Sequence, residues 1–256
     1  MITYEFPINE RIRTFLRLEN LYNRAVVFLD QDQAEVHHVA LLAIFEMLDV
    51  TGRTDLKSEV LQELERQRVH LTEFKGNPSV EENLVAGFLD QIESARTSLL
   101  NSAGRTGQEL RENDWLNSVR QRTSIPGGVC QFDLPSYHYW LNRHLDTRKK
   151  DLRGWLNPFK TLADGVIVIL KLLRQSGQIE KVNSTGGNFQ KSLSGKTAHL
   201  VRVKIKHPVD VIPEVSANKY LLNIRFTIPG NLSRKPTQEN VDFELSFCNL
   251  LLSSHT

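Results

Sequence analysis

Apolar residues recur every three or four positions along the first half of the chain, as they do on the buried face of an α-helix. Stretches with this spacing begin near Asn9, Val36, Asp55, Ser79 and Thr106. Short segments with glycine, proline or asparagine separate them, and several starts carry a residue that caps helices well. We therefore expect five amphipathic helices in series, which form a helical bundle.

The fifth stretch carries Arg120 and Arg122 and stops at Pro126-Gly127-Gly128. Proline has no backbone donor and forces the preceding residue out of the helical region, while the two glycines tolerate positive φ. We expect a short extended segment near residues 129–132. A helix should then start at Pro135, because proline is favoured in the first helical turn. This short helix carries Tyr137, His138 and Trp140.

A long apolar stretch follows, from Asn157-Pro158 to about Gly177. Its middle, residues 165–170, is apolar on nearly every side, which is typical of a helix at the centre of a protein. After Gly177 the spacing of apolar residues changes from helical to alternating. We expect a hairpin near residues 179–189, and further antiparallel strands near residues 201–205, 220–228 and 241–247.

The order of these elements predicts an α+β fold, with an N-terminal helical bundle and a mostly antiparallel β-sheet subdomain in the C-terminal part. We place a mainly helical domain at residues 1–177, a β subdomain packed on it at residues 178–249, and a tail at residues 250–256. The chain has 256 residues, of which 40% are apolar and 24% charged. Such a composition suits a globular protein with a sizeable core.

The sequence lacks the usual signatures of targeting, membrane insertion and catalysis. The N-terminal residues lack the apolar centre of a secretory signal, and the longest apolar run is far shorter than the ~20 residues that span a bilayer. Cys130 and Cys248 lack zinc or redox spacing. Signatures of a nucleophile, a metal or a phosphate loop are missing, so we expect a cytosolic binding protein without enzymatic activity, cofactor or metal. We expect the pair His37-His38 to be exposed.

Positive charge is concentrated in the second half of the chain. The net formal charge is only +2, but residues 143–153 and 196–225 carry +3 and +4. One hypothesis is therefore a nucleic-acid-binding protein that uses the 143–153 cluster with Arg202, Lys204 and Lys206. The affinity of such a protein for nucleic acid should fall steeply as the salt concentration rises. Against this hypothesis, the sequence has no helix-turn-helix, zinc-finger or aromatic RNA-binding motif.

Two sets of arginines allow more than one interpretation. Arg13 and Arg17 lie four positions apart on the first expected helix, where like charges repel and need an acidic partner or a ligand. That partner is either Glu10 or a neighbouring helix, unless the row faces a ligand. Arg225 lies on the polar face of an expected strand. It either pairs with an acidic residue, Asp242 or Glu244, across the sheet or lies exposed at a binding surface.

Residues 120–140 read RQRTSIPGGVCQFDLPSYHYW. This run resembles the central signature of the ZapD family of bacterial division proteins. Residues 5–21, 61–68, 218–226 and 242–248 are also similar to segments of that family, in the same order. The resemblance therefore extends over nearly the whole chain, although none of its segments is a catalytic fingerprint.

The resemblance implies a cell-division function. Proteins of this family are non-enzymatic cytoplasmic homodimers that are recruited to midcell. They bind the C-terminal tail of FtsZ, the tubulin-like division GTPase. They also cross-link and bundle FtsZ protofilaments, promote Z-ring assembly and lower the GTPase activity of FtsZ. By this resemblance we expect FtsZ as the partner, a homodimer, and neither nucleic acid nor membrane as a ligand.

We expect basic residues within the similar segments to bind the FtsZ tail, because arginine can bond a carboxylate with two parallel hydrogen bonds. The candidates are Arg13, Arg17, Arg120, Arg122, His138, Lys219 and Arg225. Some of them should instead form salt bridges within the protein. Tyr137 and Trp140 are the expected apolar anchors, since aromatic residues often dominate binding energy.

Overall fold

The structure is a computed structural model of the chain. It describes residues 1–52, 55–74, 82–193, 198–206, 210–218, 220–230 and 236–250. This part of the chain forms two compact units. One consists of Met1–Arg13 together with the residues from Leu170 onward, and the other of Thr14–Ile169. Strands make up most of the first unit and helices most of the second.

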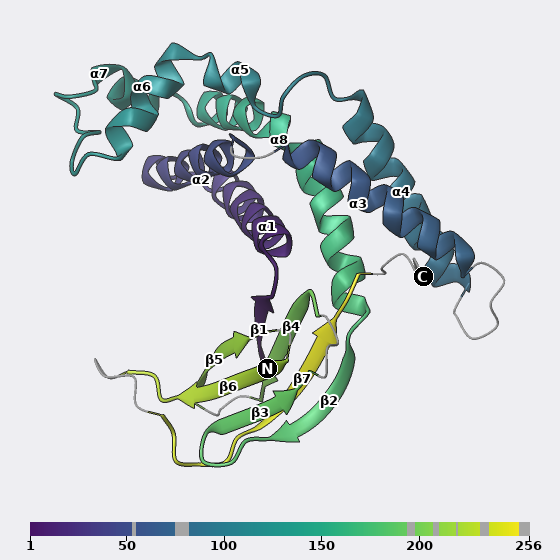
Figure 1. Ribbon diagram of the computed structural model, residues 1–256. Coiled ribbons are helices and arrows are strands. Elements are labelled where there is room, and N and C mark those ends of the chain that lie inside the picture. The colour runs from purple at the N-terminus through teal and green to yellow at the C-terminus, as the bar shows by residue number, and fades with distance from the viewer. Residues whose placement is uncertain are drawn as a thin grey trace. The chain divides into compact units, whose positions relative to one another are not determined.

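The helical unit confirms most of the predicted helices (Figure 1). The helices are α1 (Glu10–Leu29), α2 (Ala34–Gly52), α3 (Leu56–Glu73), α4 (Glu82–Asn101), α5 (Gln108–Arg111), α6 (Asp114–Thr123), α7 (Pro135–Leu141) and α8 (Leu145–Gln175). Two of these helices have the expected N-terminal caps. Asn9 Oδ1 accepts the Ile12 N–H at 2.8 Å, and the Asp55 carboxylate accepts the Ser58 N–H at 3.3 Å. Ser79, the expected start of the fourth helix, lies outside the described residues.

Three local predictions in this unit are wrong. The single helix expected from Thr106 to Arg122 is two helices, because Asn113 starts a new one by accepting the Leu116 N–H at 2.9 Å. Residues 129–132 form consecutive turns and not an extended segment. The last helix begins at Leu145, twelve residues before the expected start, and continues through Pro158. Buried residues on both sides of this proline offset the backbone hydrogen bond that it cannot make.

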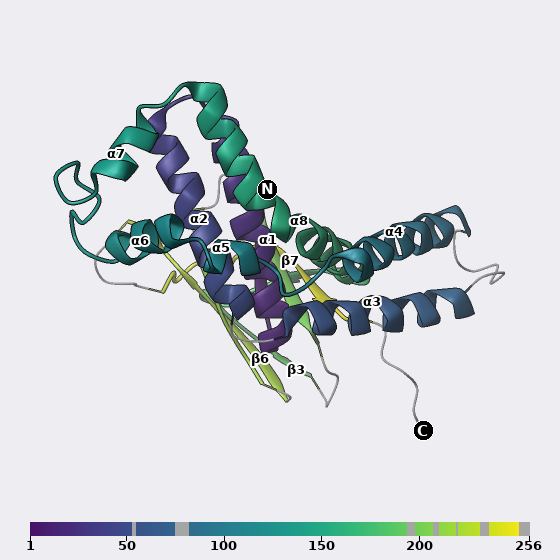
Figure 2. The same ribbon diagram turned by 90° about the horizontal axis from the view of Figure 1, so that it is seen from above.

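The helical unit is elongated, with different elements at its two ends. Helices α3 and α4 form an antiparallel pair at one end, while α6, α7 and the turn between them lie at the other (Figures 1 and 2). Helix α2 contacts both α6 and α7. The two helices on either side of the turn, of which α6 carries Arg120 and Arg122, are therefore held against α2.

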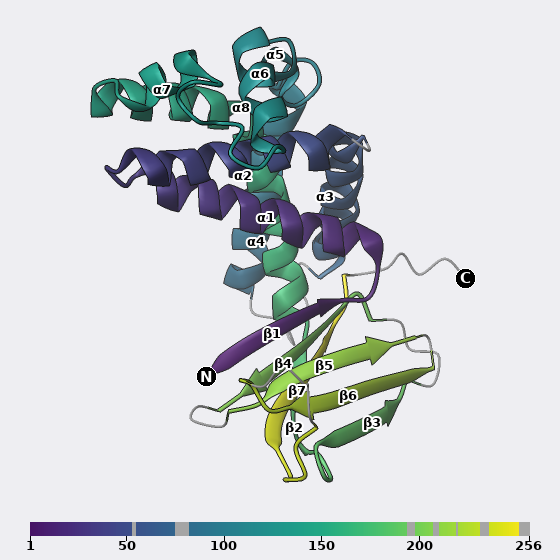
Figure 3. The ribbon, with the colours of Figure 1, turned by 90° about the vertical axis from the view of Figure 1, so that its left-hand side faces the viewer.

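The other unit contains two antiparallel sheets (Figure 3). A four-stranded sheet has the order β1-β4-β7-β2, and a three-stranded sheet has the order β3-β6-β5. The strands are β1 (Ile2–Pro7), β2 (Gln178–Asn183), β3 (Asn188–Ser192), β4 (Leu200–Ile205), β5 (Ile212–Ala217), β6 (Leu221–Thr227) and β7 (Asp242–Cys248). The predicted α+β class with antiparallel strands is thus confirmed.

The strand pairing differs from the prediction in two ways. The hairpin expected near residues 179–189 does not form, because β2 pairs with β7 in one sheet and β3 pairs with β6 in the other. The turn between β2 and β3 therefore links the two sheets. In addition, β1 and β5 were not predicted, although Ile2, Tyr4 and Phe6 alternate with polar residues. Strand β5 contains Pro213 and lies at a sheet edge, where proline is tolerated.

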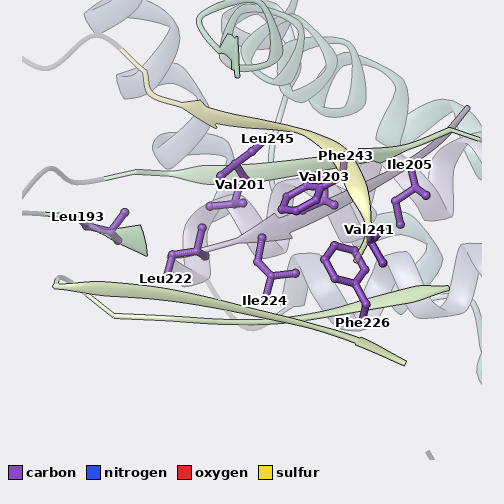
Figure 4. Packing of buried hydrophobic residues seen from close by; sticks show 10 residues of the cluster. All are labelled: Leu193, Val201, Val203, Ile205, Leu222, Ile224, Phe226, Val241, Phe243 and Leu245. Atoms are coloured by element: carbon purple, nitrogen blue, oxygen red, sulfur yellow. The ribbon is translucent and has the colours of Figure 1, made fainter. Parts of the chain in front are cut away.

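The two sheets pack face to face around one apolar core (Figure 4). Val203 and Leu245 of the four-stranded sheet point toward Leu222 and Ile224 of the three-stranded sheet. Because side chains alternate along a strand, the residues between these buried ones point outward. The outward faces are therefore the polar surfaces on which strand residues can meet a ligand.

An ion-pair network fixes the unpredicted first strand to the rest of its unit. The Glu5 carboxylate on β1 accepts hydrogen bonds from the Arg174 guanidinium near the end of α8, at 2.8 and 2.9 Å. Arg202 of β4 places its Nε 3.0 Å from Glu5 Oε1, without hydrogen-bond geometry. These contacts join the N-terminal strand to α8 and β4, which lie far from it in sequence. Among the helices of the described residues, none is both long enough and apolar enough to cross a bilayer.

Candidate functional site

The turn between α6 and α7 has a fixed backbone. The Ile125 N–H donates to the Arg122 carbonyl at 3.0 Å, the Gly128 N–H to the Ile125 carbonyl at 2.9 Å, and the Cys130 N–H to the Gly127 carbonyl at 3.1 Å. Gly127 has a φ of 70°, and a Cβ on Gly128 would lie only 2.4 Å from the Arg122 carbonyl oxygen. This conformation requires both glycines.

Four aromatic rings of α6, α7 and α8 form a cluster. Its rings belong to Trp115, Tyr137, Trp140 and Trp155, with neighbouring centroids 5.5 to 6.2 Å apart. Trp115 Nε1 donates to Ser136 Oγ at 3.1 Å, and Trp140 Nε1 to Asp151 Oδ2 at 3.0 Å. Tyr137 and Trp140 are buried, so the prediction that they anchor a ligand at the surface is wrong. They belong to the core.

Other apolar side chains of the turn are exposed. Phe132 is 78% exposed, Tyr139 71% and Ile125 49%. Sequence reasoning missed Tyr139, although Tyr137 and Trp140 share one face of α7 and Tyr139 lies on another. Phe132 lies in the turn, where no periodic pattern indicates which side chains are buried. The exposed aromatic residues of this region are therefore not the predicted ones.

The predicted cations on the two helices that flank the turn, α6 and α7, have different partners. Arg120 forms an ion pair with Asp49 of α2. Arg122 Nη1 lies 4.0 Å from Asp133 Oδ1, and both side chains are more than one-third exposed. His138 is exposed on α7, and its Nε2 lies 3.5 Å from Asn142 Nδ2. Arg120 is thus engaged within the protein, while Arg122 and His138 remain open to solvent.

Helix α1 carries the next pair of predicted cations. Arg13 Nε lies 3.1 Å from Glu10 Oε2, one turn earlier on the same helix. This contact is the internal pairing that the sequence left open for Arg13. Arg17 lies one turn further along and is exposed. An ion pair between exposed side chains contributes little free energy, so Arg13 can exchange Glu10 for another carboxylate.

Arg225 lies on the outward face of the three-stranded sheet. Its neighbours Ile224 and Phe226 point into the core, and its register partners are Asn188 on β3 and Glu214 on β5. Asp242 and Glu244, the predicted alternatives, belong to the other sheet, so the expected pairing with them is wrong. Lys219, the remaining candidate, lies outside the described residues.

A shallow hollow of about 360 Å³ surrounds Arg225. We call it the sheet hollow; its polar lining includes Asn188, Gln190, Glu214, Ser216, Asn223 and Arg225. The Asn223 Oδ1 atom is buried and accepts no hydrogen bond from the described residues. Within the same part of the chain, Arg225 has no ion-pair partner. The hollow therefore combines the Arg225 guanidinium with three amide side chains, the Ser216 hydroxyl and the Glu214 carboxylate.

The basic cluster at residues 143–153 is largely engaged by the protein itself. Arg148 is buried, donates to His37 Nδ1 at 3.1 Å and to the Leu141 carbonyl at 3.1 Å, and also reaches the Asp32 carbonyl at 2.9 Å. Lys149 Nζ lies 2.8 Å from Asp32 Oδ1. Arg143 and Arg153 also have acidic partners. This cluster is therefore not a free basic surface.

The expectation that both histidines of the pair are exposed is wrong. His37 is fully buried, and its Nε2 lies 2.8 Å from the Gln31 carbonyl oxygen, while His38 Nδ1 lies 2.6 Å from the Tyr137 hydroxyl. Burial lowers the pKa of both histidines. No group of three or more His, Cys, Asp or Glu side chains that could hold a metal ion is found in the described part of the chain.

Comparison with known proteins decides the family. A sequence model of the family named ZapD, described as cell division protein, matches residues 16–225. The chain belongs to the ZapD family. The relative from Dechloromonas aromatica is 51% identical over 252 residues, covering 98% of this chain and 100% of the relative. The relatives from Aromatoleum aromaticum and Azoarcus sp. are each 49% identical over 251 residues; these cover 98% of this chain and 98% and 100% of the relatives.

All three relatives are named Cell division protein ZapD. Membership of the ZapD family gives this chain a role in cell division. The matched range contains the turn between α6 and α7 and reaches Arg225 on β6, whereas Arg13 lies just before it. Both surfaces described above thus fall within the part that defines the family.

Proposed function

We propose that this protein is a non-enzymatic division factor that binds the C-terminal tail of FtsZ. In this proposal it acts in the cytoplasm at midcell as a homodimer, cross-links and bundles FtsZ protofilaments, and promotes Z-ring assembly. It also lowers the GTPase activity of FtsZ. Membership of the ZapD family supports the cell-division role, and the sheet hollow supplies a surface suited to a peptide.

The observation that carries the tail-binding proposal is the setting of Arg225. An extended peptide exposes backbone donors and acceptors, which the amide side chains Asn188, Gln190 and Asn223 can bond. The Arg225 guanidinium can bond a peptide carboxylate with two hydrogen bonds. Because no described residue forms an ion pair with Arg225, binding a tail there breaks no such contact.

The other predicted cations differ in how readily they could contact the tail. Lys219 is close to Arg225 in sequence and would add a second positive charge to that segment. Arg13 and Arg17 remain candidates for a second contact with the tail. Arg120 has Asp49 as its partner and would have to release it. We therefore propose Arg225 as the principal contact.

Bundling follows from having two tail sites in one particle. A tail that binds each site weakly can still hold filaments together, because many tails on one polymer raise the local concentration of ligand. Filaments fixed side by side exchange subunits more slowly, which lowers GTP turnover without any chemistry by this chain. This mechanism requires no cofactor and no catalytic residue.

The nucleic-acid hypothesis is less well supported by the positions of its residues. It needs the 143–153 cluster and Arg202 as free cations, but Arg148 is buried and Arg202 lies against Glu5. Lys204 and Lys206 share a hollow with Asp242 and Glu244, so their positive charge is partly neutralised there. Nucleic-acid affinity depends on neutralising many phosphates, which is more than two lysines can do.

The proposal is tested by sedimenting GTP-assembled FtsZ with this protein. We expect co-pelleting and bundling with full-length FtsZ and neither with FtsZ that lacks its tail. Arg225→Glu should abolish co-pelleting at moderate salt, whereas Lys181→Glu, a charge reversal at an exposed site on β2, should not. Equal binding of the tail-less FtsZ would refute the tail as the ligand. Equal behaviour of the two variants would refute the sheet hollow as its site.

A further inference from the structure

A cavity in the helical unit lies where several helices end or begin. It has a volume of about 650 Å³ and is bordered by the C-terminal end of α2, the N-terminal end of α3, the turn between α4 and α5, and α8. All of its lining residues belong to the unit Thr14–Ile169. We call it the junction cavity. Its volume is in the range that is usual for sites of small ligands.

Two cations that line the junction cavity bond neutral oxygen atoms. Lys57 Nζ donates to the Ser102 carbonyl at 2.6 Å, and Arg105 Nη2 donates to the Gly52 carbonyl at 2.7 Å. In the part of the chain that the structure describes, neither side chain forms an ion pair. An ammonium has three donors and a guanidinium has five, so these bonds leave donors on both groups for a ligand.

A third cation lies directly behind the wall of the cavity. A Cβ on Gly52 would lie 3.2 Å from Arg111 Nη1, so this guanidinium contacts the wall without lining the cavity. Arg111 donates to the Leu48 carbonyl at 2.6 Å and to Thr51 Oγ1 at 3.0 Å, and its buried Nε has no hydrogen-bond partner among the described residues. Burial, and then the positive charge of Arg105, lower the pKa of Arg111. The two arginines therefore lie close enough to repel each other.

Two carboxylates near the cavity are engaged with other groups. Asp55 lines the cavity and caps α3, where it accepts the Ser58 N–H at 3.3 Å and the Ser58 hydroxyl at 2.6 Å. Asp49 of α2 forms an ion pair with Arg120. The cations of the cavity are thus not neutralised by direct contact with either carboxylate.

Positive charge exceeds negative charge around the cavity. Lys57, Arg105 and Arg111 carry three positive charges and Asp55 carries one negative charge, which leaves a surplus of two. The last carbonyls of α2, which accept hydrogen bonds from both arginines, supply only about half a negative charge. Cations that are removed from water normally have an anion beside them. A ligand with two negative charges would therefore complete the cavity.

We propose that the junction cavity binds a small phosphate ester. A phosphate monoester carries about −1.5 to −2 charges at pH 7 and three acceptor oxygens, so it matches the surplus better than a single carboxylate does. The Arg105 guanidinium can bond two of these oxygens and the Lys57 ammonium the third. Leu56, Leu61 and Leu162 line the same cavity and offer an apolar surface to the organic part of the ester.

Phenyl phosphate is the probe for this proposal, because it joins one phosphate to one apolar ring. Its binding to the full chain is measured by NMR titration, in parallel with inorganic phosphate and with phenol. We expect one phenyl phosphate per chain, bound about tenfold more tightly than inorganic phosphate because the ring is buried as well. Phenol should not bind at the same concentrations. Failure of phenyl phosphate to bind at millimolar concentrations, or equal binding of phenol, would overturn the proposal.

The two lining cations are tested with the double variant Lys57→Gln and Arg105→Gln. Arg105 is exposed and Lys57 half-buried, so the fold should be retained, which circular dichroism and thermal melting can verify. We expect the dissociation constant of phenyl phosphate to rise by about tenfold or more. The control is the double variant Lys150→Gln and Arg153→Gln, which removes the same charge from exposed positions of α8. Equal affinity in the two double variants would contradict the proposal.

Asp55→Asn should have the opposite effect on binding. Asparagine caps helices about as well as aspartate does, so α3 should keep its first turn. The variant removes the negative charge that lines the cavity, and phenyl phosphate should bind about threefold more tightly. Unchanged or weaker binding would show that the phosphate does not lie in the junction cavity.

The inference goes beyond the proposed function and does not depend on it, because the junction cavity and the sheet hollow belong to different units. The Lys57→Gln and Arg105→Gln variant should still co-pellet with FtsZ filaments. Arg225→Glu should lose FtsZ and bind phenyl phosphate as the wild type does. Competition between a synthetic FtsZ tail peptide and phenyl phosphate would overturn the assignment, since the junction cavity would then be a tail site.

Discussion

The C-terminal end of α6 and the sheet hollow both present an arginine to solvent, but they surround it differently. Arg122 lies in the last turn of α6, 4.0 Å from Asp133, and the loop that follows it contains the exposed side chains Ile125 and Phe132. Arg225 lies among three amide side chains, the Ser216 hydroxyl and the Glu214 carboxylate on the outward face of a sheet. The first environment favours apolar contacts around the charge, and the second favours hydrogen bonding to a polar chain.

The difference shows that an arginine acquires its role from its neighbours. The sequence predicted that both residues bind one FtsZ tail, because both are basic and lie in segments similar to the same family. The structure assigns them to different units. Variants of one buried and one exposed residue in each region can therefore test whether the two arginines really lie in different environments.

The largest expected effect distinguishes two adjacent aromatic residues on α7. Trp140 is 4% exposed and contacts three other rings, so Trp140→Ala should lower the free energy of unfolding by about 3–5 kcal/mol. Tyr139→Ala, at the exposed neighbour, should change it by less than about 0.5 kcal/mol. Urea unfolding followed by circular dichroism, at several protein concentrations, measures both. Similar losses would mean that Tyr139 supports the fold and is not a surface for binding.

A smaller effect is expected from an added methyl group in the turn. The Cβ of Gly128→Ala would lie 2.4 Å from the Arg122 carbonyl oxygen, and because this oxygen belongs to the backbone, the turn itself must shift. We expect a loss of about 1–3 kcal/mol in the free energy of unfolding. The control is Gly154→Ala in α8, where no atom lies within 4 Å and helix propensity should add up to ~1 kcal/mol. An unaltered Gly128→Ala variant would show that the turn is not rigid.

The helices were largely predictable because their signals are local. Apolar spacing and capping residues act within a few positions, and the caps at Asn9 and Asp55 formed as the sequence indicates. The start of α8 was wrong because Pro158 was interpreted as a first-turn residue. Burial on both sides of that proline keeps the helix continuous, and burial depends on the rest of the fold.

The sheets and the candidate site were less predictable because strand pairing is not local. The strands β2 and β3 are neighbours in sequence but enter different sheets, and this division separates Arg225 from Asp242 and Glu244. The alternation of residues did predict the outward direction of Arg225. It gave no information about which strands would lie on either side of it.

A still smaller effect compares two arginines on the sheets. Arg202 is about one-fifth exposed and contacts Glu5, whereas Arg225 is exposed and has no ion-pair partner among the described residues. Arg202→Gln should lower the free energy of unfolding by about 1 kcal/mol, because Glu5 keeps its hydrogen bonds to Arg174. Arg225→Gln should leave it within about 0.5 kcal/mol while weakening tail binding. A marked loss of stability in Arg225→Gln would mean that Arg225 has a structural partner and is not available to a ligand.

The last expected effect is a dependence of stability on pH. His38 bonds the hydroxyl of Tyr137 in the aromatic cluster, His37 accepts from Arg148, and burial lowers the folded-state pKa of both histidines. A histidine in the unfolded chain ionises near pH 6.5, at about its unperturbed pKa. The stability from these two groups is therefore complete above about pH 6.5 and declines as the pH falls below that value, since the unfolded chain then binds more protons. Urea midpoints at pH 7.5 and 5.5 measure the decline, and His38→Asn, whose amide can still bond Tyr137, should reduce it. An identical decline in this variant would exclude His38 as a source of the acid sensitivity and leave His37, which contacts Arg148, as the group to test.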